Sequence, residues 1–476
     1  MLNRVYESSK QSLGGSALYI AVSDGEKSLI VSGKGDVYDK FLGVETVIDG
    51  VPAKVCRLNH VNAKMIRELF PFAAPSNHKG RPLTVGLGDR LGLASPGHIR
   101  LVKDMDVFPV LAQQSIRELN LTGRTYDDVM DAATWAVFQE NYRKGWGGDG
   151  DHLKTAAEVH MALECGYTMI TLDCSEHIRN DVAPMSDAEV SALYARLPAD
   201  QRAAYEAEYL NKTFVIEPGT EISFTEPELE RIVLIYKGAI DHTDRIYNDI
   251  LAKCGRPVDF EMSIDETLST TSPAQHFFVA HELVKRGVEC VSLAPRFCGE
   301  FQKGIDYIGD VDEFRKEFAL HAKIAKHFGY KISVHSGSDK FMVFPIIREE
   351  SAGVYHLKTA GTNWLEGLRV IAKKSPDIFR KISKFALANL SEAKKYYHIT
   401  ENVANIPDID SIPDAELTKL LDQPDSRQVL HVTYGLILSA KKDGKYVFRD
   451  DIYYILEQNE DEYCAALEKH IGRHLS

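Results

Sequence analysis

The sequence predicts an α/β protein built on a (β/α)8 TIM-type barrel, with an N-terminal α+β cap, an insertion after the fourth strand and a C-terminal helical extension. Short β-rich runs alternate with helical stretches from about residue 81, which indicates a parallel sheet, and eight such repeats favour a closed barrel over an open doubly wound sheet. Several of these runs end at a polar or ionisable residue. Because the carboxyl ends of all strands of a parallel barrel open onto one face, the pattern predicts one enzyme site there.

Residues 1–80 are expected to form the N-terminal α+β cap. The stretch SALYIAVSDGEKSLIVSG has the alternation of two strands joined by an Asp-Gly turn, and VNAKMIRELFPF has the spacing of a short helix. The rhythm of short strands and helices begins after this cap.

The catalytic barrel is expected over residues 81–364. Thr125 and Asp128 have the spacing of a capping box before one helical stretch, and Pro273 stands in the first turn of another. The third strand has the weakest pattern of the eight. The expected strands are LTVGL (83–87), FPVLA (108–112), residues 143–146, TMITLD (168–173), DFEMSI (259–264), CVSLA (290–294), KISVH (331–335) and VYHLK (354–358).

Residues from about 182 to 255 interrupt the alternation between the fourth and fifth strands. They contain a helical stretch, a hairpin pattern in KTFVIEPGTEISF and a long helical pattern that begins at Pro227. Loops on the catalytic face of a barrel commonly grow in this way. Residues 365–476 carry mostly helical patterns and are expected to form a C-terminal helical region.

Charge and cysteine usage narrow the class of protein. The net charge of −13 and the pI near 5.7 argue against a nucleic-acid partner, because phosphate neutralisation needs clustered Lys and Arg. The seven cysteines are odd in number, scattered and without a CxxC pair, which favours reduced thiols in a cytoplasmic protein over disulfides or a thiolate zinc site. Without an apolar leader or a run of roughly 20 apolar residues, we expect no membrane partner. A homo-oligomer is compatible with the sequence.

The segment GWGGDGDHLKT (145–155) combines closely spaced glycines with two aspartates and a histidine. Its glycines have the spacing of a dinucleotide fingerprint, but a helical stretch precedes them, and Asp149 and Asp151 would repel a phosphate. We therefore expect no nicotinamide cofactor. The segment is interpreted either as an Asp-capped helix start or as a loop that points Asp151 and His152 into the barrel site.

Strand ends from distant parts of the chain bring imidazole and carboxylate groups to the predicted face. Period-2 spacing directs Glu261 and Asp265 of the fifth strand inward, with Glu266 at its lip. His335 and His356 belong to the last two strands. A histidine taken alone is more often a hydrogen-bonded structural residue, but two imidazoles and a carboxylate that converge can hold a divalent metal. The sequence predicts metal ligands at Glu266, His335 and His356, for Zn, Mn, Co or Ni.

Cationic, amide and imidazole side chains at or just after strand ends are candidates for binding a substrate. The cationic side chains can hold a carboxylate, and the alternative for each is an ion pair with a neighbouring acid. The amides can bind sugar hydroxyls or cap the next helix. The candidates are Arg90, Gln113, Gln114, His152, Arg296, Lys303 and Lys358.

Seven stretches give the chain a resemblance to the tagaturonate epimerase family of hexuronate catabolism. The likeness runs through the barrel into the C-terminal region, and several stretches are long enough to be specific. The resemblance implies a metal-dependent epimerase that interconverts tagaturonate and fructuronate, with relatives acting on ketohexoses such as fructose and tagatose. The stretches are GLGDRLGLASPGHIR, DDVMDAATWAVFQENYRKGWGGDGDHLKT, LDCSEHI, MSIDET, APRFCGEFQKG, SVHSGSDKF and YHLKTAGTNW.

The implied substrates differ at C4, where the ketone does not acidify the C–H bond, so enolisation cannot invert this centre. Oxidation by a nicotinamide and retro-aldol cleavage with re-addition remain, and the absence of a credible dinucleotide fingerprint favours the second. We expect a divalent cation to act as Lewis acid and Asp151 and Asp173 to transfer protons. One of Arg90, Arg296 and Lys303 is expected to hold the substrate carboxylate.

Two other functions stay open at this point. A metal-dependent aldolase or ketose isomerase fits the same barrel, because a fold does not choose its reaction. An aldolase would release fragments, whereas an epimerase returns a six-carbon isomer. A non-catalytic sugar-acid-binding protein would be stabilised by its ligand without turnover, which agrees poorly with so many ionisable groups at strand ends.

Overall fold

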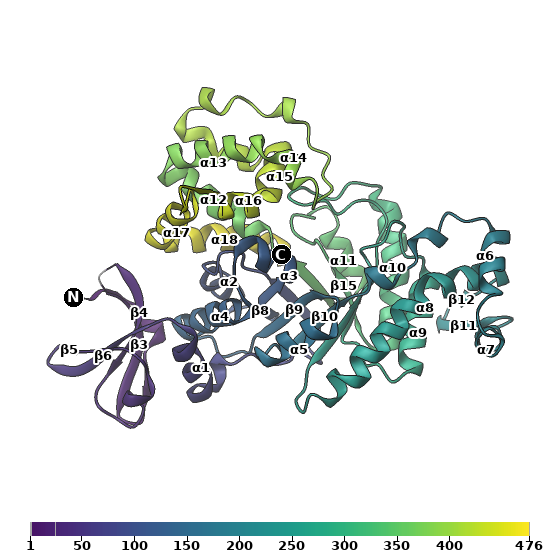
Figure 1. The fold of residues 1–476 in the computed structure, drawn as a ribbon, viewed down its shortest axis with the longest axis horizontal. Helices are drawn as coiled ribbons and strands as arrows, with labels where there is room; N and C mark the ends of the chain where they lie inside the picture. The colour runs from purple at the N-terminus through teal and green to yellow at the C-terminus, as the bar shows by residue number, and fades with distance from the viewer. Residues whose placement is uncertain (1, 24, 476) are drawn as a thin grey trace. The chain divides into compact units, whose positions relative to one another are not determined.

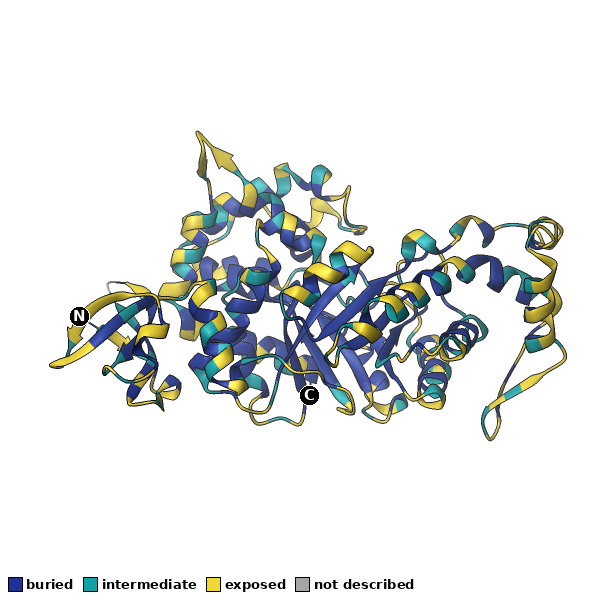
Figure 2. Cartoon of the chain, turned by 60° about the horizontal axis from the view of Figure 1, so that its bottom comes forward, coloured by how far each residue is buried: buried dark blue, intermediate teal, exposed yellow. Residues whose placement is uncertain are grey.

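The computed structural model describes residues 2–23 and 25–475. Within this part of the chain, eight parallel strands form a closed barrel in the order β10-β13-β14-β15-β16-β7-β8-β9, which confirms the predicted fold class (Figure 1). Figure 2 shows barrel strands as buried ribbons. In chain order the strands are β7 (Leu83–Leu87), β8 (Phe108–Ser115), β9 (Gly147–Leu153), β10 (Met169–Asp173), β13 (Asp259–Ser263), β14 (Ser292–Ala294), β15 (Lys331–Val334) and β16 (Tyr355–Thr359).

The prediction was wrong about the position of the third strand. It was expected near 143–146, but β9 covers Gly147–Leu153, which includes most of the glycine- and aspartate-rich segment. Glycine and aspartate have low strand propensity, so the local pattern pointed elsewhere. The strand forms because its surroundings suit these two residue types. A Cβ added to Gly150 would lie only 3.0 Å from the Cβ of Ala162, which favours glycine at this position, and Asp149 is fully buried. Tertiary packing therefore overrides local propensity here.

The contacts divide the chain into two compact units, which are described separately. Unit 1 comprises Met1–Ser76, Leu87–Gly148 and Ala360–Ser476, and unit 2 comprises Asn77–Gly86 and Asp149–Thr359. The division expected from the sequence (1–80, 81–364, 365–476) follows the type of secondary structure and stays a prediction.

Unit 1 contains an antiparallel sheet in the order β1-β3-β4-β6-β5, with β2 paired to β3. The two strands expected around an Asp-Gly turn are β3 and β4, and Asp24 of that turn lies outside the described residues. The expected short helix is α1 (His60–Leu69), capped by the Asn59 side chain. The strands are β1 (Leu2–Val5), β2 (Gln11–Leu13), β3 (Ser16–Ser23), β4 (Glu26–Ser32), β5 (Val44–Ile48) and β6 (Val51–Arg57).

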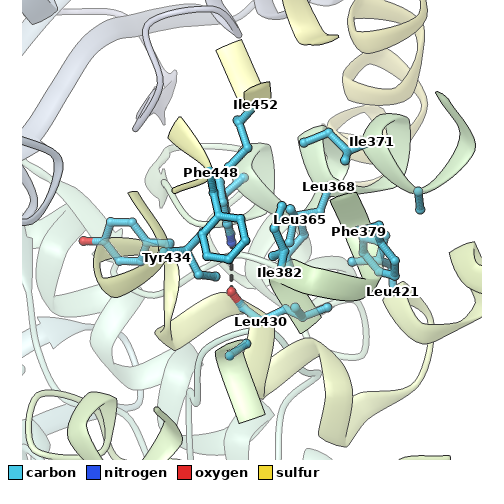
Figure 3. Packing of buried hydrophobic residues seen from close by; sticks show 14 of the residues in the cluster. Leu365, Leu368, Ile371, Phe379, Ile382, Leu421, Leu430, Tyr434, Phe448 and Ile452 are labelled. Atoms are coloured by element: carbon cyan, nitrogen blue, oxygen red, sulfur yellow. Dashed lines mark hydrogen bonds between the residues drawn. The ribbon is translucent and has the colours of Figure 1, made fainter. Parts of the chain in front are cut away.

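The C-terminal helices of unit 1 enclose a large apolar cluster (Figure 3). Leu365 and Leu368 of α12 pack there with Ile382 and Phe448, and the Trp364 indole donates to the Leu430 carbonyl at 2.8 Å. The predicted capping box of Thr125 and Asp128 begins α4. The helices of this unit include α2 (Ser95–Val102), α3 (Ile116–Thr122), α4 (Tyr126–Glu140), α12 (Thr362–Lys374), α13 (Pro376–Ala388), α14 (Leu390–Ala393), α15 (Pro424–Val432), α16 (Tyr434–Ser439), α17 (Arg449–Gln458) and α18 (Glu460–Leu475).

Unit 2 carries the insertion between the fourth and fifth barrel strands, as expected. Helices α6 (Asp187–Tyr194) and α7 (Ala199–Tyr209) are followed by the hairpin of β11 (Thr213–Glu217) and β12 (Thr220–Ser223), and α8 (Glu226–Asp249) leads back to the barrel. The other helices of this unit include α5 (Ala156–Glu164), α9 (Pro273–Lys285), α10 (Val311–Phe328) and α11 (Phe344–Glu350). No helix of residues 2–23 and 25–475 has the length and apolar character needed to cross a membrane.

Candidate functional site

Strand β9 brings two consecutive polar side chains into the site of unit 2. Its register to β10 pairs Gly150 with Ile170 and Leu153 with Leu172, so β9 carries one extra residue, a β-bulge at Asp151 and His152. His152 has a φ of +53°, in the left-handed region that β-strands normally avoid. The bulge lets the Asp151 carboxylate reach Lys358 while the His152 ring lies 4.9 Å from that of His335, edge to face.

Lys358 of β16 is enclosed by carboxylates. Its ammonium lies 2.8 Å from Asp149 Oδ2, 2.8 Å from Asp151 Oδ1 and 3.0 Å from Glu261 Oε1, and it also donates to the Thr171 hydroxyl. Burial alone would lower the pKa of Lys358, but the three carboxylates outweigh it and raise this pKa well above its ordinary value. Lys358 therefore stays an ammonium, and it is not a free amine that could attack a carbonyl.

The carboxylates around Lys358 differ in their pKa values. Burial raises the pKa of Asp149 to about 6, although Lys358 opposes the rise. For Asp151 burial also favours the neutral form, but Lys358, His152 and His335 together hold its pKa below the usual value. Lys358 and His335 also hold the pKa of Glu261 well below its usual value against the effect of burial, so Asp151 and Glu261 stay ionised across the physiological range.

His335 lies between two acids. Its Nε2 is hydrogen-bonded to Glu261 Oε1 at 2.7 Å, and its Nδ1 lies 3.1 Å from Asp265 Oδ1, an ion-pair distance without hydrogen-bond alignment. Burial disfavours charge on the ring, but Asp265 and Glu261 overcome this and raise the pKa of His335 to about 10. This arrangement favours the protonated ring, and a protonated imidazole can donate protons.

His356 stays neutral in the barrel interior. The Thr84 hydroxyl is 2.7 Å from its Nδ1, while its buried Nε2 has no hydrogen bond to any described residue. Burial, reinforced by Lys358 and Lys331, lowers the pKa of His356 to about 3 although Glu261 opposes the change.

A second grouping with the spacing of metal ligands lies beside these residues. Ligand atoms of His152, Asp173 and Glu266 lie within 4.8 Å of one another. Asp173 Oδ2 is buried and accepts no hydrogen bond from the described residues, and the ammonium of Lys154 lies 3.6 Å away. One imidazole and two carboxylates form a donor set suited to a divalent cation.

Comparison with known proteins identifies the family. A family model described as tagaturonate epimerase matches residues 6–476. The chain belongs to the tagaturonate epimerase family. The tagaturonate/fructuronate epimerase of Thermotoga maritima is 39% identical over 472 residues, which cover 99% of this chain and 96% of that protein. Native and glycerol-complexed crystal structures of fructuronate-tagaturonate epimerase UxaE from Cohnella laeviribosi are 48% identical, with a TM-score of 0.96 and coverage of 99% and 96%.

Membership of the tagaturonate epimerase family confirms the resemblance in the sequence and the predicted enzyme class, an isomerase. The structure places the predicted metal ligands in different surroundings. Glu266 groups with His152 and Asp173, which were expected to bind substrate and to transfer protons, whereas His335 and His356 lie outside this grouping. The set of Glu266, His335 and His356 stays a prediction.

The candidate substrate-binding cations of unit 2 lie in three settings. Lys358 is held by its carboxylates. The Lys303 ammonium donates to the Ser336 hydroxyl at 2.9 Å, and Ser336 directly follows His335 in the chain. Arg296 is half-buried, and its backbone N–H donates to Thr271 Oγ1.

The other candidate substrate-binding residues lie in unit 1. The buried Arg90 donates from Nε to Glu118 at 3.0 Å and stacks on Tyr434, with its guanidinium 3.8 Å from the ring centre. This matches the alternative of an ion pair with a neighbouring acid. Gln113 and Gln114 are buried at the end of β8, and neither caps the next helix, because Ser115 forms the capping box with Glu118.

The sequence patterns predict no role in the site for Glu261 and Asp149, although both contact Lys358. Glu261 stands on the inward side of its strand by period-2 spacing, so this signal was available. Asp149 was considered only as a helix cap or a group that repels phosphate, because its segment was not recognised as a strand.

Lys358→Met should lower the free energy of unfolding by about 3–5 kcal/mol at pH 8, because three buried carboxylates lose their cation. The loss should shrink toward pH 5. Without the ammonium, at least one of these carboxyls has a folded-state pKa above its unfolded value, so protonation stabilises the folded variant as the pH falls.

Urea unfolding at both pH values measures this effect. Lys154→Met makes the same substitution at a lysine whose side chain is 33% exposed, and it should cost less than about 1 kcal/mol. Equal unfolding midpoints for Lys358→Met and the unchanged protein at pH 8 would contradict the ionic role of Lys358.

His152→Gly should be at least as stable as His152→Ala, the reverse of the usual order in strands, where glycine costs about 0.5–1 kcal/mol relative to alanine. Both variants lose the imidazole, but only glycine adopts the φ of +53° without the left-handed penalty of about 1–2 kcal/mol. Thermal unfolding midpoints of the two variants decide the order. A clearly more stable alanine variant would show that the bulge carries no backbone strain.

Proposed function

We propose that this chain interconverts tagaturonate and fructuronate with the help of a divalent cation held in unit 2. The observation that carries the proposal is the match to relatives named for this activity, over 99% of the chain. The site of unit 2 supports it, because acids, imidazoles and cations gather at one set of strand ends.

His152, Asp173 and Glu266 would hold the cation, and the chemistry of these donors suits Zn, Mn, Co or Ni. When bound, the cation supplies Lewis-acid polarisation of the substrate ketone. The surrounding charge fits a cation as well, because among the described residues six carboxylates gather around the buried Lys358 and His335 and the partly exposed Lys154. The carboxylates are Asp149, Asp151, Asp173, Glu261, Asp265 and Glu266.

Inversion at C4 can proceed by retro-aldol cleavage and re-addition. The C4 hydroxyl loses its proton as the C3–C4 bond breaks, so C4 becomes an aldehyde and the bonding pair passes through C3 to the ketone oxygen, giving an enediolate. The aldehyde then turns its other face, the C3–C4 bond forms again, and the C4 oxygen regains a proton. No oxidant is consumed, so the route requires no nicotinamide.

We assign the proton transfers at the C4 oxygen to Asp151 and His335. Lys358 keeps Asp151 ionised, which makes it an acceptor, and the acids around His335 keep it protonated, which makes it a donor. An acceptor and a donor on different strands are what the two half-reactions need. In this proposal Asp173, expected from the sequence to transfer protons, serves instead as a ligand.

The substrate carboxylate is assigned to Lys303, with Arg296 on the same loop. The Lys303 ammonium donates to a neutral hydroxyl, that of Ser336, and Ser336 follows the proposed proton donor His335. A substrate anion at this ammonium would therefore lie beside the reacting groups.

The test uses protein stripped by a chelator and then restored with Mn, Co, Ni or Zn. Restored protein should convert tagaturonate into fructuronate with full recovery of six-carbon product, and stripped protein should form little, because the Lewis acid is gone. Chromatography of both isomers measures the conversion, and fructose serves as the neutral comparison substrate. Accumulation of three-carbon fragments, or binding of tagaturonate without turnover, would contradict the proposal.

A further inference from the structure

The Glu261 carboxylate of β13 contacts both the proposed proton donor, His335, and the ammonium of Lys358. Its side chain is fully buried. Its Oε1 lies 2.7 Å from His335 Nε2 and 3.0 Å from Lys358 Nζ, and its Oε2 accepts from the Ser292 hydroxyl. The Thr171 hydroxyl approaches Oε1 at 3.3 Å.

These four partners come from different elements around the barrel. Thr171 belongs to β10, Ser292 to β14 and Lys358 to β16, while His335 follows β15. One carboxylate therefore fixes side chains from four neighbouring strands or strand ends. Because Glu261 occupies the Nε2 edge of His335, the opposite edge with Nδ1 is directed toward Asp265.

We propose that Glu261 is a positioning residue for the epimerisation. It orients His335 through Nε2, which sets the Nδ1 edge of the ring toward Asp265, and it shares Lys358 with Asp151. The inference rests on the proposed function and deepens it, because it names the group that sets the geometry of the proton donor. Glu261 itself is expected to contact neither substrate nor cation.

Glu261→Gln is the sharpest test, because glutamine has the same shape. Its carbonyl oxygen can accept from His335 and Lys358, and its NH2 can donate to the Ser292 hydroxyl, so the fold is retained while the negative charge is lost. We expect kcat for tagaturonate to fall by about 10²-fold with KM changed less than about threefold, since substrate binding is left intact. The content of bound Mn or Co should stay unchanged.

A double-mutant cycle shows whether Glu261 acts through His335. If it does, Glu261→Gln added to His335→Gln should lower kcat by less than about threefold further, whereas independent effects would multiply. The imidazole resonances of His335 in NMR spectra should also shift in Glu261→Gln, a readout that does not require turnover. Multiplying effects, an unshifted resonance or loss of the metal would overturn the proposal.

Glu282→Gln is the matched control. Glu282 of α9 is also buried and charge-paired, with Arg286 and Lys285, and it accepts from Tyr209. Its substitution should lower the thermal unfolding midpoint but leave kcat within about twofold and the His335 resonance in place. A fall in kcat as large as that of Glu261→Gln would show a merely structural effect.

Misfolding of Glu261→Gln and failure of the proposed function can each be distinguished from failure of the positioning role. If Glu261→Gln does not fold, Ser292→Ala keeps the charge but frees Oε2, and it should lower kcat by about 3–10-fold; unchanged kcat would then overturn the proposal. If the unchanged protein fails to interconvert the two ketouronates, the proposed function fails. The NMR comparison would then still decide whether Glu261 sets the state of His335.

Discussion

The ammonium of Lys358, surrounded by three carboxylates inside a closed barrel, is the interaction on which the rest of the site depends. Asp149 and Asp151 come from β9 and Glu261 from β13, so one cation ties three strands together. Unpaired, these carboxylates would repel one another in a medium that solvates charge poorly. Paired, they make it possible for a strand rich in glycine and aspartate to lie in the barrel wall.

Two of the carboxylates around Lys358 connect it to the other groups of the site. Asp151 is followed in the bulge by His152, whose left-handed backbone turns the imidazole toward Asp173 and Glu266. Glu261 is hydrogen-bonded to His335. In the proposed function, the same set of charges therefore supports two different roles: a group of ligands suited to a cation, and a protonated imidazole suited to giving a proton. Polar networks of this kind fix side chains in one arrangement only when every member is satisfied.

Much of the barrel could be predicted from the sequence, because buried parallel strands are continuous apolar runs. The first turns of helices also carry recognisable residues, such as the N-cap Thr125 and Pro273. Strand β9 could not be predicted in this way, because its stability in the barrel depends on Lys358, about 200 residues away in the sequence. Strand ends also specify which side chains share a face, but not which of them meet. Glu266 is expected at the lip of its strand, but its grouping with His152 and Asp173 depends on the bulge at His152, which no local pattern reveals.

The position of the bound cation distinguishes the proposed ligand set from its alternatives. Crystals of the protein grown with Mn or Co, measured at the absorption edge of the metal, give its position from anomalous scattering. We expect one strong peak within coordination distance, about 2.0–2.2 Å, of His152, Asp173 and Glu266. A peak bound instead by His335 and His356, or by Glu261, would contradict this ligand set, because the imidazolium and its positioning acid would then be ligands.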